Sequence, residues 1–508
     1  MTNINAQWGG WARQPDPIPK EEIKRTIIAD VVVIGAGFAG VTCALRSAQM
    51  GAEVVVLEKS SSWTACGANI GVINSGYLKE RGYENDPEAV AREWIKLCGN
   101  RCDEKILWLY LKNGGRAMDW LIDIVTMPEY GAVPALRGCM YKGETYREIV
   151  ASHCFTGGQI PNHPAGAAIN AMSCESVKLG VQYLYQTPAE QLVKEDGRVT
   201  GVIARDHDGY LLIRARHRGG VVLATGNIGG NDEMCKDLAP IANRCAAKVY
   251  WKKDGNMGDG HRMGLWAGGS FEDTPFPTIM HPQAFHYSNF FFLFVKPDGT
   301  RFMNEDNYVQ GKSVALIRER LEYAWAIADS DWATKVPPTL QYGGGMFWGQ
   351  DCLLGESDFS IEWEKKNFES GIERGVVVKA DTPEELARGM GVPEDAFVQT
   401  FGRYNRMAAG GKDEDFGKRR ELLIPLDKPP FFGMKFGSAL LAVVGGLRVD
   451  TKMRVLDEYS SPVRGLYAIG NTAGGRYGVD YPIHVAGNSL GTALTFGFLL
   501  GESFTQSD

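Results

Sequence analysis

Two continuous apolar runs near the start of the chain are separated by a segment with helical spacing. Residues 27–37 read IIADVVVIGAG, residues 37–51 place apolar side chains at helical intervals, and residues 52–59 read AEVVVLEK. Apolar runs of this length are typical of strands buried on both faces of a parallel sheet. The pattern therefore predicts a βαβ unit, preceded at 1–25 by a polar, proline-containing arm on the surface.

The alternation of strands and helices stops near the middle of the chain. Residues 183–206 read as strand, loop, strand, turn and strand, with a strong hairpin signal at Asp196-Gly197. Between about 240 and 395, aromatic residues and loops become frequent, which predicts an inserted second domain. The strand-rich stretch 445–471 then indicates that the chain returns to the first domain.

Composition and charge narrow the class of protein. Of the 508 residues, 44% are hydrophobic and 23% are charged, as in a globular enzyme, and the formal net charge is -7. No basic cluster indicates nucleic acid or anionic lipid as a partner. No apolar run has the length of a membrane span or the form of a signal peptide, so we expect a cytoplasmic protein. The ten cysteines lack metal-site spacing, and we expect them to be reduced and no metal to be bound.

The first strand-to-helix turn carries the pattern GxGxxG. Gly35, Gly37 and Gly40 let bare backbone approach a pyrophosphate, to which the following helix offers its N–H groups. Glu58 ends the next strand, where a carboxylate can accept hydrogen bonds from the ribose hydroxyls of adenosine. Two further small-residue turns, 223–231 and 465–475, would each be an ordinary tight turn if they stood alone. Together, the three stretches favour FAD over NAD.

These motifs resemble the flavoprotein family of fumarate reductase and succinate dehydrogenase, with 3-ketosteroid dehydrogenases as relatives. The carrying stretches are VVVIGAGFAG, VVVLEK, VVLATGNIGGN, GDGHRMGLWAGG, DGTRFMNE and GLYAIGN, and the likeness extends from about residue 27 to 502. It implies an α/β fold, in which a Rossmann-like FAD-binding domain (26–240 and 395–508) carries an inserted α+β capping domain (241–394), with the reaction between the two.

The resemblance also implies which residues contact FAD. The family's covalent flavin histidine is absent from residues 60–76, so the FAD is expected to be held noncovalently. The implied FAD contacts are Gly35, Gly37, Ala39, Gly40, Glu58, Lys59, Ala68, Asn69, Gly71, Ala189, Thr225, Gly226, Asp259, Gly470, Asn471, Asn488, Ser489 and Leu490. The last three begin a helix whose N–H groups can face the flavin N1 and O2 atoms, although a plain helix start explains them as well.

Two departures from the fumarate reductases bear on the substrate. Their arginine that delivers the proton is missing after Asn304-Glu305, and His484 stands where their second arginine grips a carboxylate. A dicarboxylate clamp is therefore not expected. Tyr481-Pro482 instead resembles the YPG motif with which ketosteroid dehydrogenases place a tyrosine hydroxyl and a glycine N–H on a ketone, but here the glycine, Gly487, follows only after a longer turn.

The expected chemistry requires donors at a substrate oxygen. Hydride transfer from reduced flavin N5 to the carbon β to a carbonyl leaves negative charge on the carbonyl oxygen. We assign Tyr481 and His484 to that oxygen, with the N–H of Gly487 as a further donor. The proton donor is Tyr308 or His281. A histidine before proline is as often structural, and an aromatic residue in a cap usually just packs.

Three functions follow as alternatives. The first is reduction of a carbon–carbon double bond conjugated to a carbonyl or carboxylate, with an external electron donor such as NAD(P)H, a small flavoprotein or a ferredoxin. The second is the reverse reaction, a dehydrogenase that desaturates a cyclic ketone with an acceptor such as a quinone. The third is a noncatalytic FAD electron-transfer or scaffold subunit. The run FFFLF at 290–294 suits an apolar small-molecule substrate.

Overall fold

The computed structural model describes residues 8–139, 147–160, 163–249, 254–286, 288–342 and 361–504, and its largest sheet has eight strands. β1 pairs in parallel with both β2 and β9, as the predicted βαβ unit requires. The order is β16-β17-β8-β9-β1-β2-β6, with β7 paired to β8. The strands are β1 (Ile23–Ile34), β2 (Val54–Leu57), β6 (Gln182–Leu184), β7 (Ala189–Glu195), β8 (Arg198–Asp206), β9 (Gly209–Leu223), β16 (Arg454–Leu456) and β17 (Pro462–Ala468).

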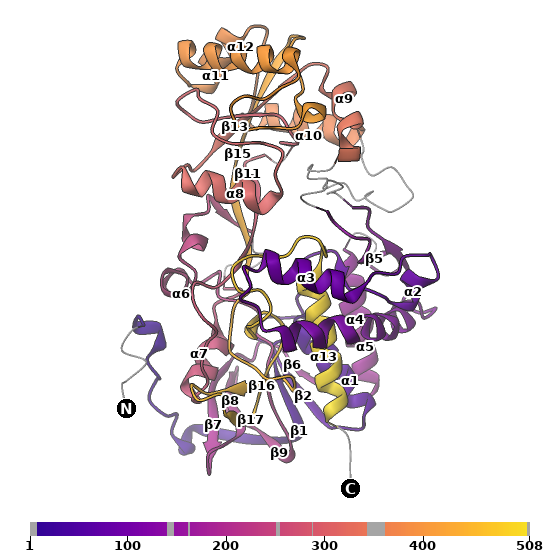
Figure 1. Ribbon diagram of the computed structural model, residues 1–508. Coiled ribbons are helices and arrows are strands. Elements are labelled where there is room, and N and C mark those ends of the chain that lie inside the picture. Colours follow the sequence, from indigo (N-terminus) through magenta and orange to yellow (C-terminus); the bar gives the residue numbers. More distant parts are fainter. Residues whose placement is uncertain are drawn as a thin grey trace.

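Helices from both ends of the chain cover this sheet. α1 packs against α13 and α5, and α13 packs against α4, so that the last helix lies beside the first (Figure 1). Residues 31–33 of β1 are fully buried, because the sheet is covered there. The helices of this part are α1 (Phe38–Gln49), α2 (Gly76–Lys79), α3 (Pro87–Leu97), α4 (Glu104–Val125), α5 (Pro164–Lys178), α6 (Asp232–Leu238), α7 (Asp259–Trp266) and α13 (Asn488–Ser503).

A second sheet, of six strands, forms the centre of the capping domain in the upper half of Figure 1. β15 is its central strand and pairs with β10, β11, β13 and β14, while β12 pairs with β13. The strands are β10 (Ala247–Lys248), β11 (Thr278–Ala284), β12 (Leu293–Val295), β13 (Ala324–Asp329), β14 (Val377–Ala380) and β15 (Phe431–Val443). The helices are α8 (Val309–Arg318), α9 (Trp332–Lys335), α10 (Ile361–Glu373), α11 (Pro383–Met390) and α12 (Glu394–Gly410).

The six-stranded sheet and the helices packed on it include residues beyond 394, where the sequence predicts the end of the capping domain. α12 contributes Phe397, Phe401 and Tyr404 to the same buried cluster as Leu386 of α11. β15 lies still further along the chain and supplies the middle of the second sheet. We therefore propose that the chain returns to the FAD-binding domain only after Val443.

A small third sheet and the N-terminal arm complete the fold. The third sheet contains β3 (Ile70–Gly71), β4 (Ala132–Leu136) and β5 (Ser152–Gly157) in antiparallel pairing. The described part of the arm packs on α6, because Trp11 is buried and its indole N–H donates to Asp237 Oδ2 at 2.7 Å. Among the described residues, no helix combines the length and the apolar character that crossing a membrane requires.

The phenylalanines of the FFFLF run lie inside the capping domain. Phe290, Phe291, Phe292 and Phe294 are at most 2% exposed, and three of them belong to a buried cluster with residues of α8, β13 and β15. Their apolar surface is therefore used to build the core of this domain. The run gives no support to an apolar substrate, contrary to the expectation from the sequence.

Candidate active site

The three glycines of the first turn have different roles in the structure. Gly35 has φ +108°, and a Cβ atom there would overlap the carbonyl oxygen of Ala224, while a Cβ on Gly40 would overlap the carbonyl of Gly35. Packing alone thus requires glycine at these two positions. A Cβ on Gly37 would be 4.0 Å from the nearest described atom, a carbonyl oxygen of Thr64. The open space therefore lies at Gly37, where a pyrophosphate is expected.

The start of α1 and the side chain of Glu58 both suit a dinucleotide. Gly37 precedes α1, and no described side chain caps that end, so that helix N–H groups remain for an anion. Glu58 is buried, with Oε2 accepting from Ala36 N at 2.9 Å and Oε1 from Ser60 N at 2.7 Å. These bonds fix the carboxylate at the carboxyl end of β2. Each oxygen retains a lone pair for a ribose hydroxyl.

Lys59 and Asp259 lie together beside this site. Lys59 Nζ donates to Asp259 Oδ2 at 2.8 Å, and Arg262 donates to Oδ1 at 2.7 Å. Burial opposes ionisation of Asp259, but the two cations hold its pKa below the ordinary value. The pair joins the end of β2 to the first residue of α7. Ala189, a further predicted contact, is the first residue of β7.

The second and third small-residue turns are joined by a threonine that the sequence analysis did not single out. Thr472 Oγ1 accepts from Thr225 N and donates to Gly226 O, both at 3.0 Å. The Thr225 hydroxyl also accepts from Gly260 N at 2.9 Å, which adds the start of α7. A Cβ on Gly470 would be 2.9 Å from the Cβ of Ala39 in α1. The three predicted stretches therefore converge in space.

The turn before α13 packs against residues 67–71, which include three of the predicted FAD contacts. Gly487 has φ +78°, and its carbonyl accepts from Gly71 N at 2.9 Å. A Cβ on Gly487 would be 2.5 Å from the carbonyl oxygen of Asn69, so the segment 67–71 lies against the turn before α13. A Cβ on Gly67, the neighbour of Ala68, would be 3.2 Å from Leu490 Cδ1.

Asn488 and Ser489 already have partners within the protein. The Asn488 amide donates to the carbonyls of Pro482 and Val485 at 3.0 and 2.9 Å, and its oxygen accepts from the Tyr477 hydroxyl at 2.7 Å. The Ser489 hydroxyl donates to Asn471 Oδ1 at 3.2 Å. Asn488 thus fixes the turn before α13, and Ser489 links this helix to the third small-residue turn.

Arg476 is a buried cation that the sequence analysis overlooked. It is 1% exposed, and its guanidinium donates to Thr492 Oγ1 at 3.0 Å, Ala473 O at 3.1 Å and Asn471 Oδ1 at 3.2 Å. No described carboxylate forms an ion pair with it. The sequence feature that could have identified it is an arginine placed directly after the glycine pair that ends the third small-residue turn. A positive charge beside Asn471 suits a ring that becomes anionic on reduction.

Tyr481 lies at the first turn of α13. Its hydroxyl accepts from Ser489 N at 3.2 Å, and its ring packs against that of Tyr477. Burial raises the pKa of Tyr481, so the phenol keeps its proton at neutral pH. Because the bond from Ser489 occupies a lone pair, the hydroxyl hydrogen can be donated to another oxygen.

His484 is directed toward α3. Its Nε2 lies 3.2 Å from Val90 O, and its ring meets Trp94 edge-on. Burial lowers the pKa of His484 to about 4, so the ring is neutral and its single N–H belongs to Nε2, which faces the carbonyl. Nδ1 has no hydrogen-bond partner among the described residues. This geometry does not favour His484 as a donor to a substrate oxygen.

The two predicted proton donors occupy neighbouring parts of the capping domain. The Tyr308 hydroxyl donates to Asp480 Oδ2, and Tyr308 immediately precedes α8. Gln310 of α8 accepts from Met280 N at 2.7 Å, next to His281 in β11. Burial lowers the pKa of His281 to about 4, so at neutral pH it is an uncharged residue of the sheet.

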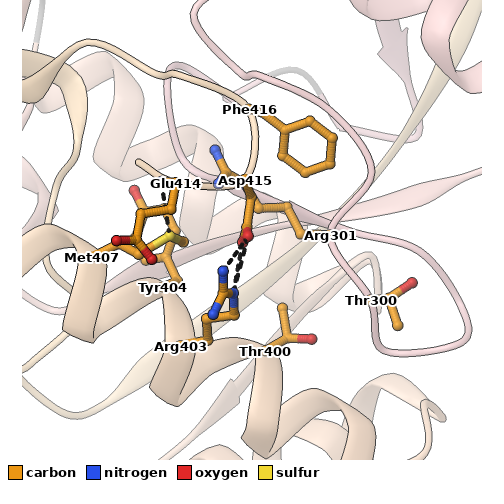
Figure 2. A pocket seen from close by; sticks show the side chains of 9 residues that line it. All are labelled: Thr300, Arg301, Thr400, Arg403, Tyr404, Met407, Glu414, Asp415 and Phe416. Atoms are coloured by element: carbon orange, nitrogen blue, oxygen red, sulfur yellow. Dashed lines mark hydrogen bonds and ion pairs between the residues drawn. The ribbon is translucent and has the colours of Figure 1, made fainter. Parts of the chain in front are cut away.

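A separate pocket of about 410 Å³ opens on the capping domain beside α12 (Figure 2). In it, Arg403 Nε donates to both carboxylate oxygens of Asp415 at 3.0 Å, so these two charges satisfy each other. None of the site residues predicted from the sequence is among its described lining residues. The lining residues are Thr300, Arg301, Thr400, Arg403, Tyr404, Met407, Glu414, Asp415 and Phe416.

Comparisons with known proteins identify relatives along nearly the whole chain. A vinyl phenol reductase from Lactiplantibacillus plantarum is 28% identical over 94% of this chain and 96% of its own length. A 3-oxosteroid 1-dehydrogenase from Mycolicibacterium smegmatis is 26% identical over 92% of this chain and 96% of its own. A solved structure, the open conformation of a flavocytochrome c3 fumarate reductase, has a TM-score of 0.72 at 22% identity and covers 98% of this chain and 82% of that one.

The family described as FAD binding domain matches residues 30–490, which include all three converging stretches. The open space at Gly37, the fixed carboxylate of Glu58 and the uncapped start of α1 fit this cofactor. The predictions of the fold class and of FAD as the cofactor are confirmed. The chain therefore belongs to the FAD-binding family and is an FAD-dependent oxidoreductase related to fumarate reductases and 3-ketosteroid dehydrogenases.

Proposed function

We propose that this protein reduces a carbon–carbon double bond conjugated to a carbonyl or carboxylate. The observation that carries the proposal is the hydrogen bond from Ser489 N to the hydroxyl of Tyr481. It orients the phenol and leaves its hydrogen for a substrate oxygen, while the positive end of α13 stabilises negative charge nearby. When bound and reduced, FAD supplies the hydride.

The chain's own residues divide the remaining tasks. Tyr481 binds the oxygen on which negative charge develops, and Tyr308 supplies the proton to the α-carbon. Gly487 remains a proposed backbone donor, because its left-handed φ at the start of α13 turns the backbone beside Tyr481. His281 and His484 are assigned supporting roles, since each is neutral and buried. The implied FAD contacts stay as assigned from the sequence.

The cofactor is proposed to be noncovalent, since residues 60–76 contain no histidine. Acid precipitation of the purified protein is expected to release all of the yellow flavin into the supernatant. Flavin that stays with the precipitate would contradict this assignment. We further propose an external electron donor and a cytoplasmic location, to which the nine free cysteines among the described residues lend support.

The reverse reaction is a second candidate. The pair Tyr481-Pro482 and the relation to a 3-oxosteroid 1-dehydrogenase favour desaturation of a cyclic ketone. Turnover of cinnamates, enones and short enoates with reduced viologen is compared with turnover of saturated steroid ketones with an artificial oxidant. Reduction alone supports our proposal, and ketone oxidation alone would replace it. Absence of both reactions would favour a noncatalytic electron-transfer or scaffold subunit.

A further inference from the structure

The side chain of Asp480 connects the capping domain to Tyr481, the residue that follows Asp480 in the chain. Its Oδ2 accepts from the hydroxyl of Tyr308, at the start of α8, and its Oδ1 accepts from the N–H of Tyr481 at 2.8 Å. The two proposed donors to the substrate are therefore linked through one carboxyl group. The link crosses between the two parts of the molecule, because Tyr308 belongs to the capping domain and Tyr481 to the C-terminal segment.

Asp480 is half-buried and lies beside the end of α3 and the loop that follows this helix. In the part of the chain that the structure describes, no lysine, arginine or histidine forms an ion pair with it. Burial raises its pKa, opposed by hydrogen bonds from Tyr308, the N–H of Tyr481 and the amide of Gln310. The titratable and charged groups on the elements around it are Tyr308 just before α8, Tyr481, the exposed Arg101 on the loop after α3, and Cys98 at the end of α3, whose thiol lies 3.6 Å from the Asp480 carbonyl. Burial raises the pKa of Cys98 too, so this thiol is neutral.

We propose that Asp480 is the positioning residue that supplies Tyr308 with protons during alkene reduction, an inference that rests on the proposed function. After hydride has reached the β-carbon, the O–H bond of Tyr308 breaks and a C–H bond forms at the α-carbon. The tyrosinate oxygen then takes the proton of the Asp480 carboxyl, which becomes a carboxylate. Water returns a proton to the carboxylate. Each of these steps transfers one proton, and none changes an oxidation state, since the two electrons of the reduction arrive with the hydride.

The hydrogen-bond pattern requires a definite order of protonation. While Asp480 is ionised, the Tyr308 hydroxyl donates to it and is not directed at a substrate. Once the carboxyl is protonated, its own O–H can donate to the Tyr308 oxygen, which releases the phenol hydrogen for the α-carbon. Alkene reduction should therefore be fast below the pKa of Asp480 and slower above it.

The test follows the rate at which an alkene reoxidises the enzyme-bound reduced FAD, by stopped flow and as a function of pH. Asp480→Asn should lose the limb in which the rate falls as pH rises, and should react at least tenfold more slowly at low pH. Tyr308→Phe should be about 100-fold slower or more, in line with the loss of a general acid. Asp123→Asn, on the exposed side of α4, is the matched control and should keep both the rate and the limb.

Each outcome decides the inference. An Asp480→Asn protein with the rate and pH profile of the wild type would overturn it while the proposed function stands. If Asp480→Asn does not fold with FAD, the rate and pH profile of Tyr308→Phe decide, because a wild-type profile there would also overturn it. If no alkene reoxidises the wild-type protein at any pH, the proposed function fails first, and the inference falls with it.

Discussion

The hydroxyl of Tyr481 lies 3.2 Å from the backbone nitrogen of Ser489, and so the phenol is fixed at the amino end of α13. The hydroxyl of Ser489 donates a hydrogen bond to Asn471, which lies in the third of the converging stretches. The proposed substrate-binding phenol and the proposed flavin contacts are therefore attached to one helix start. Because Asn488 holds this helix start independently through Pro482, Val485 and Tyr477, loss of the Tyr481 hydroxyl should affect the reaction and leave FAD binding unchanged.

Replacing Tyr481 by phenylalanine is expected to slow alkene reduction about 100-fold, because one donor at the developing oxyanion contributes on the order of 3 kcal/mol. FAD affinity should stay unchanged. The single-turnover rate and the FAD dissociation constant are both measured. Tyr459→Phe is the control, since Tyr459 is 78% exposed. A wild-type rate in Tyr481→Phe would remove this residue from the mechanism.

Two glycines of the first turn should respond differently to substitution. Gly37→Val fills the open space, so the FAD dissociation constant should rise at least about tenfold, which is about 1.4 kcal/mol. The melting temperature of the FAD-free protein should change little. Gly40→Ala places a Cβ against the carbonyl of Gly35, and it should destabilise the FAD-free protein by about 1–3 kcal/mol. Equal FAD affinity in Gly37→Val and the wild type would move the pyrophosphate elsewhere.

Arg476 should set the reduction potential of the bound flavin. Removing its charge with Arg476→Met is expected to lower the two-electron potential on the order of 30 mV, about 1.4 kcal/mol, because the reduced ring loses a nearby cation. Arg476→Lys keeps the charge and serves as the control. Spectroelectrochemical titration of both proteins measures the effect, and circular dichroism verifies folding. An unchanged potential in Arg476→Met would place this cation away from the flavin.

Asp30 should make stability depend on acidity. Burial alone raises its pKa, but hydrogen bonds from Arg218, Glu53 N and Arg216 lower the pKa to about 2. A carboxyl whose pKa is lower in the folded state stabilises the protein above its unfolded pKa, about 3.9, and this stabilisation is lost as pH falls toward 2. Urea midpoints of the wild type and Asp30→Asn should therefore differ at pH 6 and converge near pH 2. A difference that persists at pH 2 would contradict this origin.

Local sequence patterns, namely the spacing of apolar residues and the residues of tight turns, predicted much of the fold. The βαβ unit and the hairpin at Asp196-Gly197 follow from burial periodicity and turn chemistry, and the structure confirms both. The family motifs also identified stretches that converge. These features depend on neighbouring residues, so the sequence alone contains their signal.

The remaining features depend on contacts between distant residues. β15 joins the capping sheet because residues 431–443 pair with β13, about a hundred residues earlier. The composition of the sequence did not indicate that residues 431–443 belong to the capping sheet. Arg476 and the Tyr308–Asp480 bond are likewise recognised as parts of the candidate site only when distant elements lie together. The hydrogen bond of His484 to Val90 in α3 could not be foreseen for the same reason.

The most direct test of the central claim is the absorbance of the anaerobically reduced, FAD-loaded protein when conjugated alkenes are added. Our account predicts that at least one cinnamate, enone or enoate restores the oxidised flavin band in proportion to the alkene consumed. The Tyr481→Phe protein should show the same return more slowly. Reduced flavin that stays bleached with every conjugated alkene, while saturated ketones bleach the oxidised protein, would contradict the account.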